Sequence, residues 1–391
     1  MAKISIILPR IPFPLDKGDK LRAYNQILEL VKHHDVDLHC LYYGKKEALP
    51  ADFRTKLKSY HTYKLNFLII FIYTKIGFIF GSALQISFYK NHIIRKKLQK
   101  NLKNFHPQIV YYQLLRTAFY TKNLNYPIIG DFQDNMSLAM KRRYQNSKKW
   151  YRFIFKRESN LMRNFQQKEL ERITAATLIS NQDLIDVEDN LKHKISIVKN
   201  GINTNLFVPI ESIKKEYHFG FAGNLAYPPN KDACMYICQE IWPLIKKQLP
   251  DANCIFIGAS ADNELKLAAK NAGIKVTGWV DSMPEFYNKC KVLITPMRMG
   301  AGLQNKILEA LSCEVPVIST EIAAKPISTK ELNFLQVSSD KTNFATKSIA
   351  LVNSSELKSI AAEGRKFVIS SYSWSSKTKD LLKLIDKTIS C

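Results

Sequence analysis

Residues 291–320 read KVLITPMRMGAGLQNKILEALSCEVPVIST. An apolar run, 292–295, leads into a loop that carries Gly300 and Gly302. A segment with helical spacing of its apolar residues follows, and a second apolar run covers 315–319. Two apolar runs separated by a glycine loop and an amphipathic segment predict a strand–loop–helix–strand unit of a parallel sheet.

The glycine loop and the helix after it predict an anion site. Glycines leave backbone N–H groups bare at the start of a helix, where the partial positive charge suits a phosphate or diphosphate. On the polar face of the helix, Lys306 can reach a phosphate and Glu309 can accept hydrogen bonds from two ribose hydroxyls. The alternative is a solvated Lys306–Glu309 pair, worth only tenths of a kcal/mol (about 0.2–0.5).

The rest of the chain repeats this alternation of apolar runs and amphipathic stretches. Strands are expected near 3–8, 36–42, 109–113, 127–131, 176–180, 217–222, 253–258, 291–295, 316–319 and 333–337. Helices are expected near 20–33, 88–105, 136–172, 230–248, 261–272, 302–313, 355–370 and 374–389. The pattern predicts an α/β protein of two doubly wound domains, joined around 200–213, with ligands at the carboxyl ends of the strands.

Composition narrows the class of protein. The 391 residues are 46% hydrophobic, which favours two globular domains of ordinary size. With 58 Lys and Arg against 34 Asp and Glu, the formal charge of +24 predicts a polyanionic partner. Seven scattered cysteines indicate a reduced cytosolic protein with buried thiols rather than a zinc site. The amino-terminal KISIILP segment indicates a first strand and not a signal peptide.

Several stretches, in order, resemble the retaining family 4 glycosyltransferases of GT-B fold, also called group 1 glycosyltransferases. Arg298 with the glycine loop, Lys306 and the LEAL–VPVIST run resembles the family's nucleotide-sugar site. The branch associated with exopolysaccharide synthesis is the most similar one. The other similar stretches are LPRIPFPLDKGDKLRAYNQI (8–27), VKNGINTNLFVP (198–209), GFAGNLAYPPNKDA (220–233) and VTGWVDSMPEFYNKCKVLITP (276–296).

The resemblance implies a domain layout. Residues 1–200 would form an acceptor-binding Rossmann-like domain, and 201–370 a nucleotide-sugar-binding Rossmann-like domain facing it across a cleft. Residues 371–391 would form a C-terminal helix that crosses back to pack on the first domain. The implied activity is retaining, metal-independent transfer of a sugar from a nucleotide-sugar donor to a lipid-linked or saccharide acceptor, in cell-surface polysaccharide or glycolipid synthesis. The family needs no metal ion and no cofactor.

The resemblance also assigns site residues. Arg298 and Lys306 would stabilise the departing diphosphate, and Asp134, after a first-domain strand, would contact the acceptor or the charged sugar. An N-cap role for Asp134 is the alternative. The residues expected around the donor are Gly18, Gly223, Asn224, Gly300, Ala301, Gly302, Leu303 and Glu309.

Two departures from the family pattern bear on the donor site. The family often has a Glu-x7-Glu pair, and here Ala301 stands eight residues before Glu309. Many members have Arg and Lys where this chain has Asn224 and Pro229. Arg298 and Lys306 are therefore assigned the positive charge at the diphosphate.

Two segments predict association with an anionic membrane surface. Residues 141–172 carry eleven Lys or Arg with aromatic residues among them, which suits the headgroup region of a bilayer. The apolar window 67–89 is interrupted by Lys75 and two glycines, so helices of the first domain that partly contact the membrane are expected there rather than a span. Nucleic acid is excluded as a partner because no nucleic-acid module accompanies the basic segment. The expected location is the cytoplasm, at the inner face of the plasma membrane.

Two alternative functions remain at this stage. A nucleotide-sugar epimerase has the same fold, but it would need acid and base residues at the sugar. A non-catalytic membrane-bound GT-B protein is the other alternative, favoured by Ala301 and Asn224.

Overall fold

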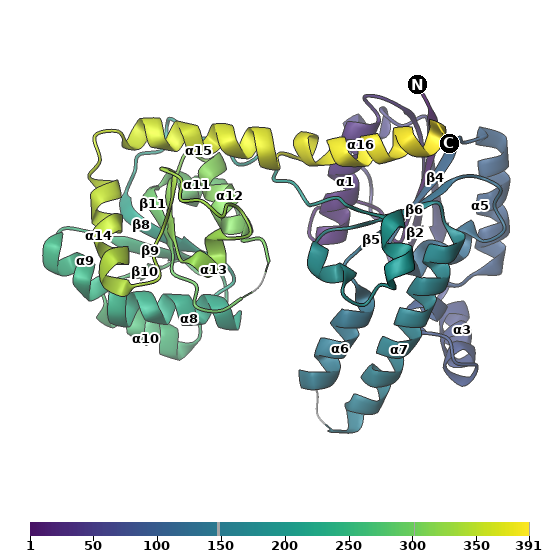
Figure 1. Cartoon of the computed structure of the whole chain (residues 1–391), viewed down its shortest axis with the longest axis horizontal. Helices are drawn as coiled ribbons and strands as arrows, with labels where there is room; N and C mark the ends of the chain where they lie inside the picture. The colour runs from purple at the N-terminus through teal and green to yellow at the C-terminus, as the bar shows by residue number, and fades with distance from the viewer. Residues whose placement is uncertain (147–148, 301, 391) are drawn as a thin grey trace. The chain divides into compact units, whose positions relative to one another are not determined.

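The computed structural model describes residues 1–146, 149–300 and 302–390, without the side chains of 142, 145–146 and 149–151. The chain divides into two units. The first comprises Met1–Gly201 with Lys377–Cys391, and the second Ile202–Ser376. Figure 1 shows the chain coloured from its amino to its carboxyl end. Each unit contains a parallel sheet with helices around it, and the prediction of two Rossmann-like domains is confirmed.

The first unit is built on a seven-stranded sheet in the order β3-β2-β1-β4-β5-β6-β7, in which every pair is parallel. Its strands are β1 (Lys3–Leu8), β2 (Asp35–Tyr42), β3 (Ser59–Lys64), β4 (Ile109–Gln113), β5 (Ile128–Gln133), β6 (Ala175–Leu178) and β7 (Ile195–Ile197). Its helices are α1 (Gly18–Leu30), α2 (Ala51–Arg54), α3 (Phe67–Ile79), α4 (Leu84–Tyr89), α5 (His92–Phe105), α6 (Met136–Asn146), α7 (Lys149–Arg172) and most of α16 (Trp374–Ser390). Short helical turns cover η1 (Leu115–Thr121), η2 (Asn181–Leu184) and η3 (Asp189–Lys194).

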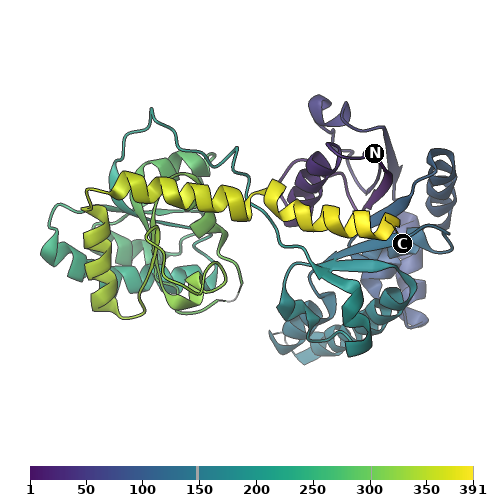
Figure 2. The same ribbon diagram turned by 45° about the horizontal axis from the view of Figure 1, so that its top comes forward.

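Two cores lie on opposite faces of this sheet because successive side chains of a strand point to opposite sides. One core joins Ile4 and Ile6 of β1 to α1 and to Leu381 and Ile385 of α16. The other joins Ile7 of the same strand to α4, α5 and α7. The C-terminal helix is therefore part of the first unit's core, and Figure 2 gives a second view of its course.

The second unit has a six-stranded parallel sheet in the order β10-β9-β8-β11-β12-β13. Its strands are β8 (Tyr217–Ala222), β9 (Cys254–Ile257), β10 (Lys275–Val276), β11 (Cys290–Thr295), β12 (Val317–Ser319) and β13 (Leu335–Val337). Its helices are α8 (Pro228–Tyr236), α9 (Trp242–Gln248), α10 (Asn263–Asn271), α11 (Met283–Asn288), α12 (Asn305–Ser312), α13 (Glu321–Ala324), α14 (Lys341–Val352) and α15 (Leu357–Tyr372), with a π-helical turn η4 (Ile237–Ile241) between α8 and α9.

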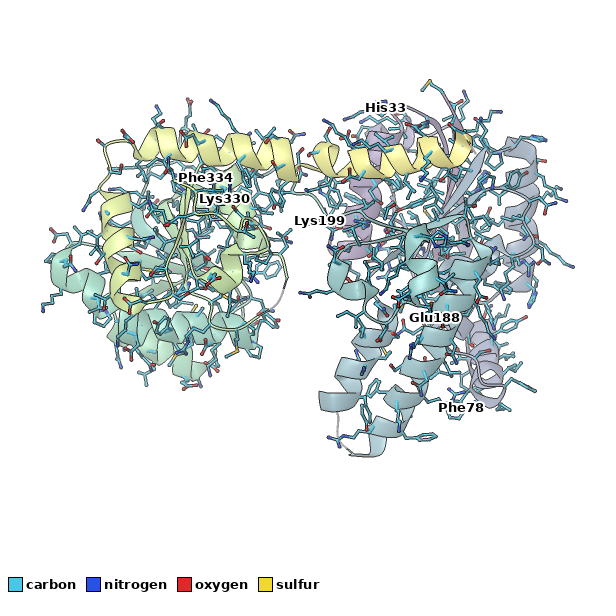
Figure 3. All side chains as sticks on the ribbon, viewed as in Figure 1. His33, Phe78, Glu188, Lys199, Lys330 and Phe334 are labelled. Carbon is cyan, nitrogen blue, oxygen red and sulfur yellow. The ribbon has the colours of Figure 1, made fainter. Side chains whose placement is uncertain are left out.

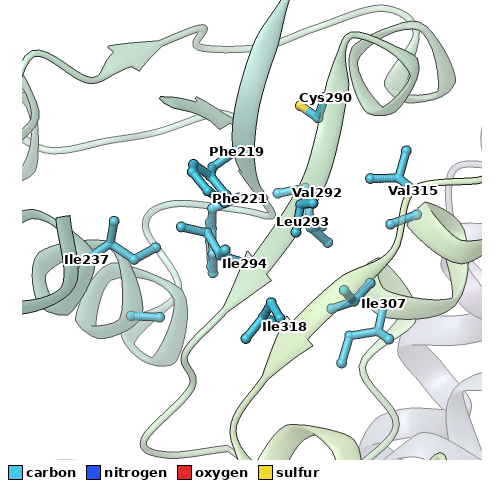
Figure 4. Close-up of a cluster of buried hydrophobic side chains, with 14 of the residues drawn as sticks. Phe219, Phe221, Ile237, Cys290, Val292, Leu293, Ile294, Ile307, Val315 and Ile318 are labelled. Carbon is cyan, nitrogen blue, oxygen red and sulfur yellow. The ribbon is translucent and has the colours of Figure 1, made fainter. Parts of the chain in front are cut away.

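The core of the second unit fixes the helix that follows the glycine loop. Phe221 of β8, Ile294 of β11 and Ile318 of β12 are fully buried, and Ile307 of α12 is buried with them (Figure 4). Apolar residues at 307, 308, 310 and 311 give α12 one buried face. That face holds the helix on the sheet and leaves the polar face, with Lys306 and Glu309, at its edge.

Six cysteines are free and buried: Cys40, Cys234, Cys238, Cys254, Cys290 and Cys313; Cys391 lies outside the described residues. Among the helices that the structure describes, none combines the length and the apolar character needed to span a bilayer.

The basic segment 141–172 forms two helices rather than one surface helix. Figure 1 shows α6 and α7 as a hairpin that extends from the sheet, with α3 beside α7. Arg152, Phe153 and Lys156 are exposed on α7. Arg157, in the same segment, donates from its guanidinium to the carbonyl oxygen of Phe78 at 2.6 Å. The side chains of 149–151, which include Trp150 and Tyr151, lie outside the described set.

Candidate functional site

The site of the second unit lies where the strand order of its sheet reverses. After β8 the chain adds β9 and β10 on one side, and after β11 it adds β12 and β13 on the other. The loops that leave β8 and β11 therefore diverge at the carboxyl edge of neighbouring strands. Such a switch point forms the ligand crevice of doubly wound sheets. Gly223 and Asn224 follow β8, and Arg298 and Gly300 follow β11, so four predicted site residues come to this edge.

Asn230, in the first turns of α8, links these loops. Its Oδ1 accepts a hydrogen bond of 2.5 Å from the Lys306 ammonium, and its Nδ2 donates to the carbonyl oxygen of Asn224 at 2.9 Å. The conformation of Gly223 leaves room for this contact. Its φ is +151°, and a Cβ there would lie 2.7 Å from Nδ2 of Asn230 and 3.4 Å from Nζ of Lys306. A side chain here would displace the Asn230 amide, and the positive φ also favours glycine.

Lys306 lies in the first turn of α12 in a half-buried position. Its ammonium is 4.3 Å from the centroid of the Phe221 ring. Burial lowers the pKa of Lys306 to about 8. The partners of this ammonium, the Asn230 amide and the Phe221 ring, carry no net charge. Its positive charge is therefore not neutralised by them and can act on a ligand. The solvated Lys306–Glu309 pair is therefore not the arrangement seen, since each side chain has another partner.

Glu309, one turn further along α12, is oriented by Tyr287 of α11. The Tyr287 hydroxyl donates to Oε2 of Glu309 at 2.8 Å. Burial raises the pKa of Glu309, while the Tyr287 hydrogen bond and the Lys306 charge act in the opposite direction. One oxygen of the carboxylate has a fixed donor, and the carboxylate has further acceptor capacity for a ligand.

Arg298 lies in the loop after β11 with its side chain half-exposed. It donates to both carboxylate oxygens of Asp232, at 3.1 and 2.5 Å, and its guanidinium lies 4.5 Å from the centroid of the Tyr236 ring. It also lines a groove of about 400 Å³. The other residues of the groove are Tyr236, Met297, Thr320, Glu321, Ile322, Lys325 and Ser339. Arg298 and Lys306 thus both contact α8, through Asp232 and Asn230 respectively.

The glycine loop and the start of α12 add backbone donors. Gly300 and Gly302 have φ of +117° and +91°, a region that favours glycine. The helix begins at Asn305, and the side chain of its N-cap residue, Gln304, makes no capping hydrogen bond. The first N–H groups of a helix have no partner within the helix and attract anions. Leu303 is half-buried here, and Ala301 lies outside the described residues.

These features together are chemically suited to a phosphorylated ligand. Backbone donors, an ammonium and a guanidinium can bind an anion, and a carboxylate one turn away can accept hydrogen bonds from hydroxyl groups. We refer to Gly223, Asn230, Arg298, Lys306 and Glu309 as the α12 site. In the described part of the chain, no three His, Cys, Asp or Glu side chains are grouped so that they could hold a metal ion.

The two site residues predicted in the first unit are Gly18 and Asp134. Gly18 was expected in a loop, but it is the first residue of α1, and a Cβ there would meet no atom within 4 Å. Asp134 follows β5 and is exposed. The cap of α6 is supplied by Asn135, whose Oδ1 accepts from the N–H of Ser137 at 3.1 Å, so Asp134 is not the N-cap.

Sequence reasoning missed a buried ion pair in this unit. Arg22 of α1 donates to both carboxylate oxygens of Asp131 in β5, at 2.8 and 2.9 Å, and both side chains are fully buried. Arg22 also donates to the Val198 carbonyl oxygen at 2.9 Å and to Oδ1 of Asn200 at 2.8 Å. It thereby fixes the segment that leaves the first unit. The arginine of the KGDKLR stretch was the available signal.

A family model described as "Glycosyl transferases group 1" matches residues 216–354, which include the α12 site. The chain is 22% identical over 403 residues to an uncharacterized 44.6 kDa protein in the cps region of Klebsiella pneumoniae, covering 95% of this chain and 97% of that one. It is 24% identical over 238 residues to a probable sucrose-phosphate synthase of Thermosipho melanesiensis, covering 53% of this chain and 51% of that one.

Solved structures share the whole architecture. Sucrose-phosphate synthase from Thermosynechococcus elongatus superposes with a TM-score of 0.63 at 11% identity, over 100% of both chains. The Anabaena protein HepE, solved in complex with UDP and glucose, superposes with a TM-score of 0.63 at 12% identity, over 99% of this chain and 100% of that one. The fold is therefore that of GT-B proteins. The family match to the group 1 glycosyltransferases covers 216–354, within the second unit.

Proposed function

We propose that this enzyme is a metal-independent, retaining glycosyltransferase that uses a nucleotide-sugar donor. Its acceptor is a lipid-linked or saccharide molecule in cell-surface polysaccharide or glycolipid synthesis. The single observation that carries the donor assignment is the α12 site, in which Lys306, with a neutral partner, and Glu309, held by Tyr287, lie one turn apart beside bare helix N–H groups.

The spacing within the α12 site matches the two parts of a nucleoside diphosphate. The diphosphate would lie at the start of α12, against Lys306 and the N–H groups after Gly302, with Arg298 leaving Asp232 to contact it. The ribose would lie one turn along the helix, where the carboxylate of Glu309 accepts its hydroxyl hydrogens. The HepE structures with UDP and with UDP-glucose support a donor of this class.

In this mechanism the two cations act on the leaving group. The bond between the anomeric carbon and the phosphate oxygen breaks, and negative charge builds on the diphosphate. Lys306, Arg298 and the helix N–H groups stabilise that charge more in the transition state than in the bound donor. The acceptor hydroxyl bonds to the same face of the anomeric carbon, and its proton passes to the departing phosphate oxygen. No protein nucleophile takes part.

We assign the binding of the acceptor to the first unit. Gly18 lies just after the loop that leaves β1, and β1 and β4 form the switch point of the first sheet. A ligand at that edge is expected on the same grounds as in the second unit. Asp134, exposed after β5, would contact the acceptor or the positive charge that develops on the sugar.

A lipid-linked acceptor implies work at the inner face of the plasma membrane. The relative in a cps region of Klebsiella pneumoniae supports a role in surface polysaccharide synthesis. Arg152, Phe153 and Lys156, all exposed on α7, give the basic and aromatic character that suits an anionic bilayer surface. Association of this kind is electrostatic and is screened over about 8 Å at physiological salt.

Product analysis tests the proposal. The enzyme is incubated with a panel of nucleotide sugars and a membrane extract, and the products are separated and their anomeric configuration is read by NMR. We expect one donor to be consumed, with release of nucleoside diphosphate and a glycoside of retained configuration. Interconversion of donor sugars without transfer would identify an epimerase instead. Binding of donor with neither outcome would identify a non-catalytic protein.

A further inference from the structure

A long stretch of the first unit carries positive charge with no acidic residue. From Phe53 to Gly130 the sequence contains 13 Lys and Arg and no Asp or Glu. This stretch forms β3, α3, α4, α5 and β4. A chance excess of lysine would still leave some carboxylates on the surface, as it does elsewhere in the chain. The surface built from these elements is therefore suited to an anionic partner.

Helix α3 in this stretch has an exposed apolar surface. Of its 13 residues only Ile70 and Gly77 are buried. Most of its large apolar side chains are exposed, up to 75% for Ile79, and Phe80, just beyond its carboxyl end, is 78% exposed. A helix that is apolar on all sides is normally buried in protein or in lipid.

The position of α3 is nevertheless fixed by α7. Arg157 donates to the carbonyl oxygen of Phe78 at 2.6 Å. Phe78, labelled in Figure 3, lies at the carboxyl end of α3. Glu158, next along α7, accepts from the N–H of Leu84 at 2.9 and 3.0 Å, at the start of α4. A cation at one helix end and an anion at the next both match the helix dipoles. The apolar surface of α3 is thus held in place and presented to the outside.

A cavity of about 430 Å³ opens beside this helix. Ile76 of α3 and Phe80, just after the helix, form one wall, and Lys90, Arg95 and Lys122 supply three cations. The remaining residues that line it are Tyr73, Gly77, Ser82, His92 and Phe119, so its described lining contains no Asp or Glu.

The three cations line the same cavity, and contacts within the protein hold one of them in place. The Arg95 guanidinium donates to the carbonyl oxygen of Lys122 at 2.9 Å and lies 5.2 Å from the centroid of the Phe119 ring. Burial, and next the charge of Lys122, lower the pKa of Lys90. Two ammonium groups close enough to affect each other, with no carboxylate in the cavity, are stabilised when an anion binds between them.

We propose that this cavity, between α3 and α5, binds the phosphate group of an anionic membrane lipid, while the exposed side chains of α3 contact the lipid's acyl chains. The proposal rests on the proposed work at a membrane surface and names the site and the lipid chemistry for it. A lipid phosphate supplies the anion for Lys90, Arg95 and Lys122. Its chains cover Ile79 and Phe80, which a soluble anion would leave in water.

The chemistry of the surface argues against other occupants. A nucleic acid or free phosphate would use the cations but not the apolar side chains of α3. A second copy of the chain would cover α3 but would bring its own 13 cations and no acidic residue from the same stretch. Like charges in contact repel, so self-association through this surface is disfavoured.

Binding of the purified full chain to vesicles tests the site. Vesicles of phosphatidylcholine alone are compared with vesicles that also contain phosphatidylglycerol. Because each cation near the surface contributes about fivefold to binding, Lys90→Ser with Lys122→Ser should weaken binding to anionic vesicles about 25-fold. Phe80→Ser should also weaken binding, because the apolar contact is lost. This difference from wild type should remain at higher salt. The charge-matched control Lys266→Ser with Lys270→Ser and the apolar control Leu267→Ser, all on exposed α10, should bind like wild type.

A competition experiment on the wild-type protein needs no variant. Short-chain phosphatidylglycerol should displace the protein from anionic vesicles at concentrations at which inorganic phosphate and an RNA oligonucleotide do not. Equal displacement by inorganic phosphate or RNA would overturn the lipid assignment, and so would equal vesicle binding by the Lys90/Lys122 variant and its α10 control. Nucleoside diphosphate binding, measured in parallel, separates the two proposals: its absence in wild type would overturn the donor function, whatever the vesicles show.

Discussion

The hydroxyl of Tyr287 donates a hydrogen bond of 2.8 Å to Oε2 of Glu309. Tyr287 is fully buried, so its hydroxyl has a fixed position. The bond therefore sets the orientation of the carboxylate on α12 before any ligand arrives. An oriented acceptor loses less conformational freedom when hydroxyl groups bind to it. The carboxylate is in this sense preorganised for the ribose that we propose as its ligand.

Glu309→Ala should weaken binding of the donor nucleotide. Hydrogen bonds to a charged acceptor are worth about 1.5–3 kcal/mol each, so we expect a loss of about tenfold or more. Isothermal titration with the nucleoside diphosphate measures it. The matched control is Glu363→Ala, an exposed glutamate on α15. Equal affinity of both variants would contradict the ribose assignment.

Tyr287→Phe should weaken donor binding less than Glu309→Ala does. The carboxylate remains but loses the donor that orients it, and a single neutral hydrogen bond contributes about 0.5–1.5 kcal/mol. The double variant separates the two effects, because Tyr287→Phe should add little once Glu309 is absent. Additive losses in the double variant would show that Tyr287 acts on the protein by another route.

Donor affinity should fall as the pH rises through the pKa of Lys306, which is about 8 in the free protein. The diphosphate binds the ammonium form, so affinity is full below this pKa. Above it, affinity should fall about tenfold per pH unit, until the pH reaches the higher pKa of the complex. Titrations from neutral to alkaline pH measure the profile. Lys306→Met should bind weakly with a flat profile, and an unchanged slope in this variant would rule out Lys306 as the group.

Arg298→Ala should lower kcat more than it weakens donor binding. In the free protein the guanidinium is held by Asp232, so it gains contact with the diphosphate only by leaving that carboxylate. Charge grows on the leaving group toward the transition state, where the arginine then contributes most. Asp232→Asn, which releases the arginine at constant size, should leave kcat intact and not raise KM. A donor complex in which Arg298 and Lys306 both point away from the phosphates would contradict these roles.

Arg22→Met should destabilise the first unit strongly. Removing one partner of a buried ion pair leaves an uncompensated charge, here Asp131, and costs about 3–5 kcal/mol. Urea denaturation followed by circular dichroism measures the change. The control Lys97→Met removes an exposed cation from α5 and should leave the midpoint unchanged. A similar small change in both variants would mean that the buried pair contributes little.

The sequence was sufficient to predict the parallel sheets because their central strands are continuous apolar runs. It was insufficient for the edge strand β3 and for some of the helices. Strand β3, SYHTYK, is half polar and was not predicted. The long helix expected near 88–105 is two helices, since Asn91 caps the second one by accepting from the N–H of Ile94. Helix α14 was also missed, because its lysines, threonines and serine interrupt the apolar spacing.

The candidate site was predictable where one short segment carries it, as with Gly300, Lys306 and Glu309. Its partners come from elsewhere in the chain. Asn230 and Tyr287 lie 76 and 22 residues from the side chains that they bind. Both residues stand in stretches that resemble the family. The sequence of these stretches does not show which side chain each of them contacts. Such pairings follow from the strand order at the switch point, which periodicity does not encode.

The release of nucleoside diphosphate tests the central claim most directly. Wild-type enzyme and Glu309→Ala are incubated with each member of a nucleotide-sugar panel and with membrane lipids that contain the acceptor. We predict that wild type releases nucleoside diphosphate from one donor and that the variant is slower by about tenfold or more under subsaturating donor. Equal rates for the two proteins would contradict a donor site at α12, and no release from any donor would contradict the proposed transferase activity.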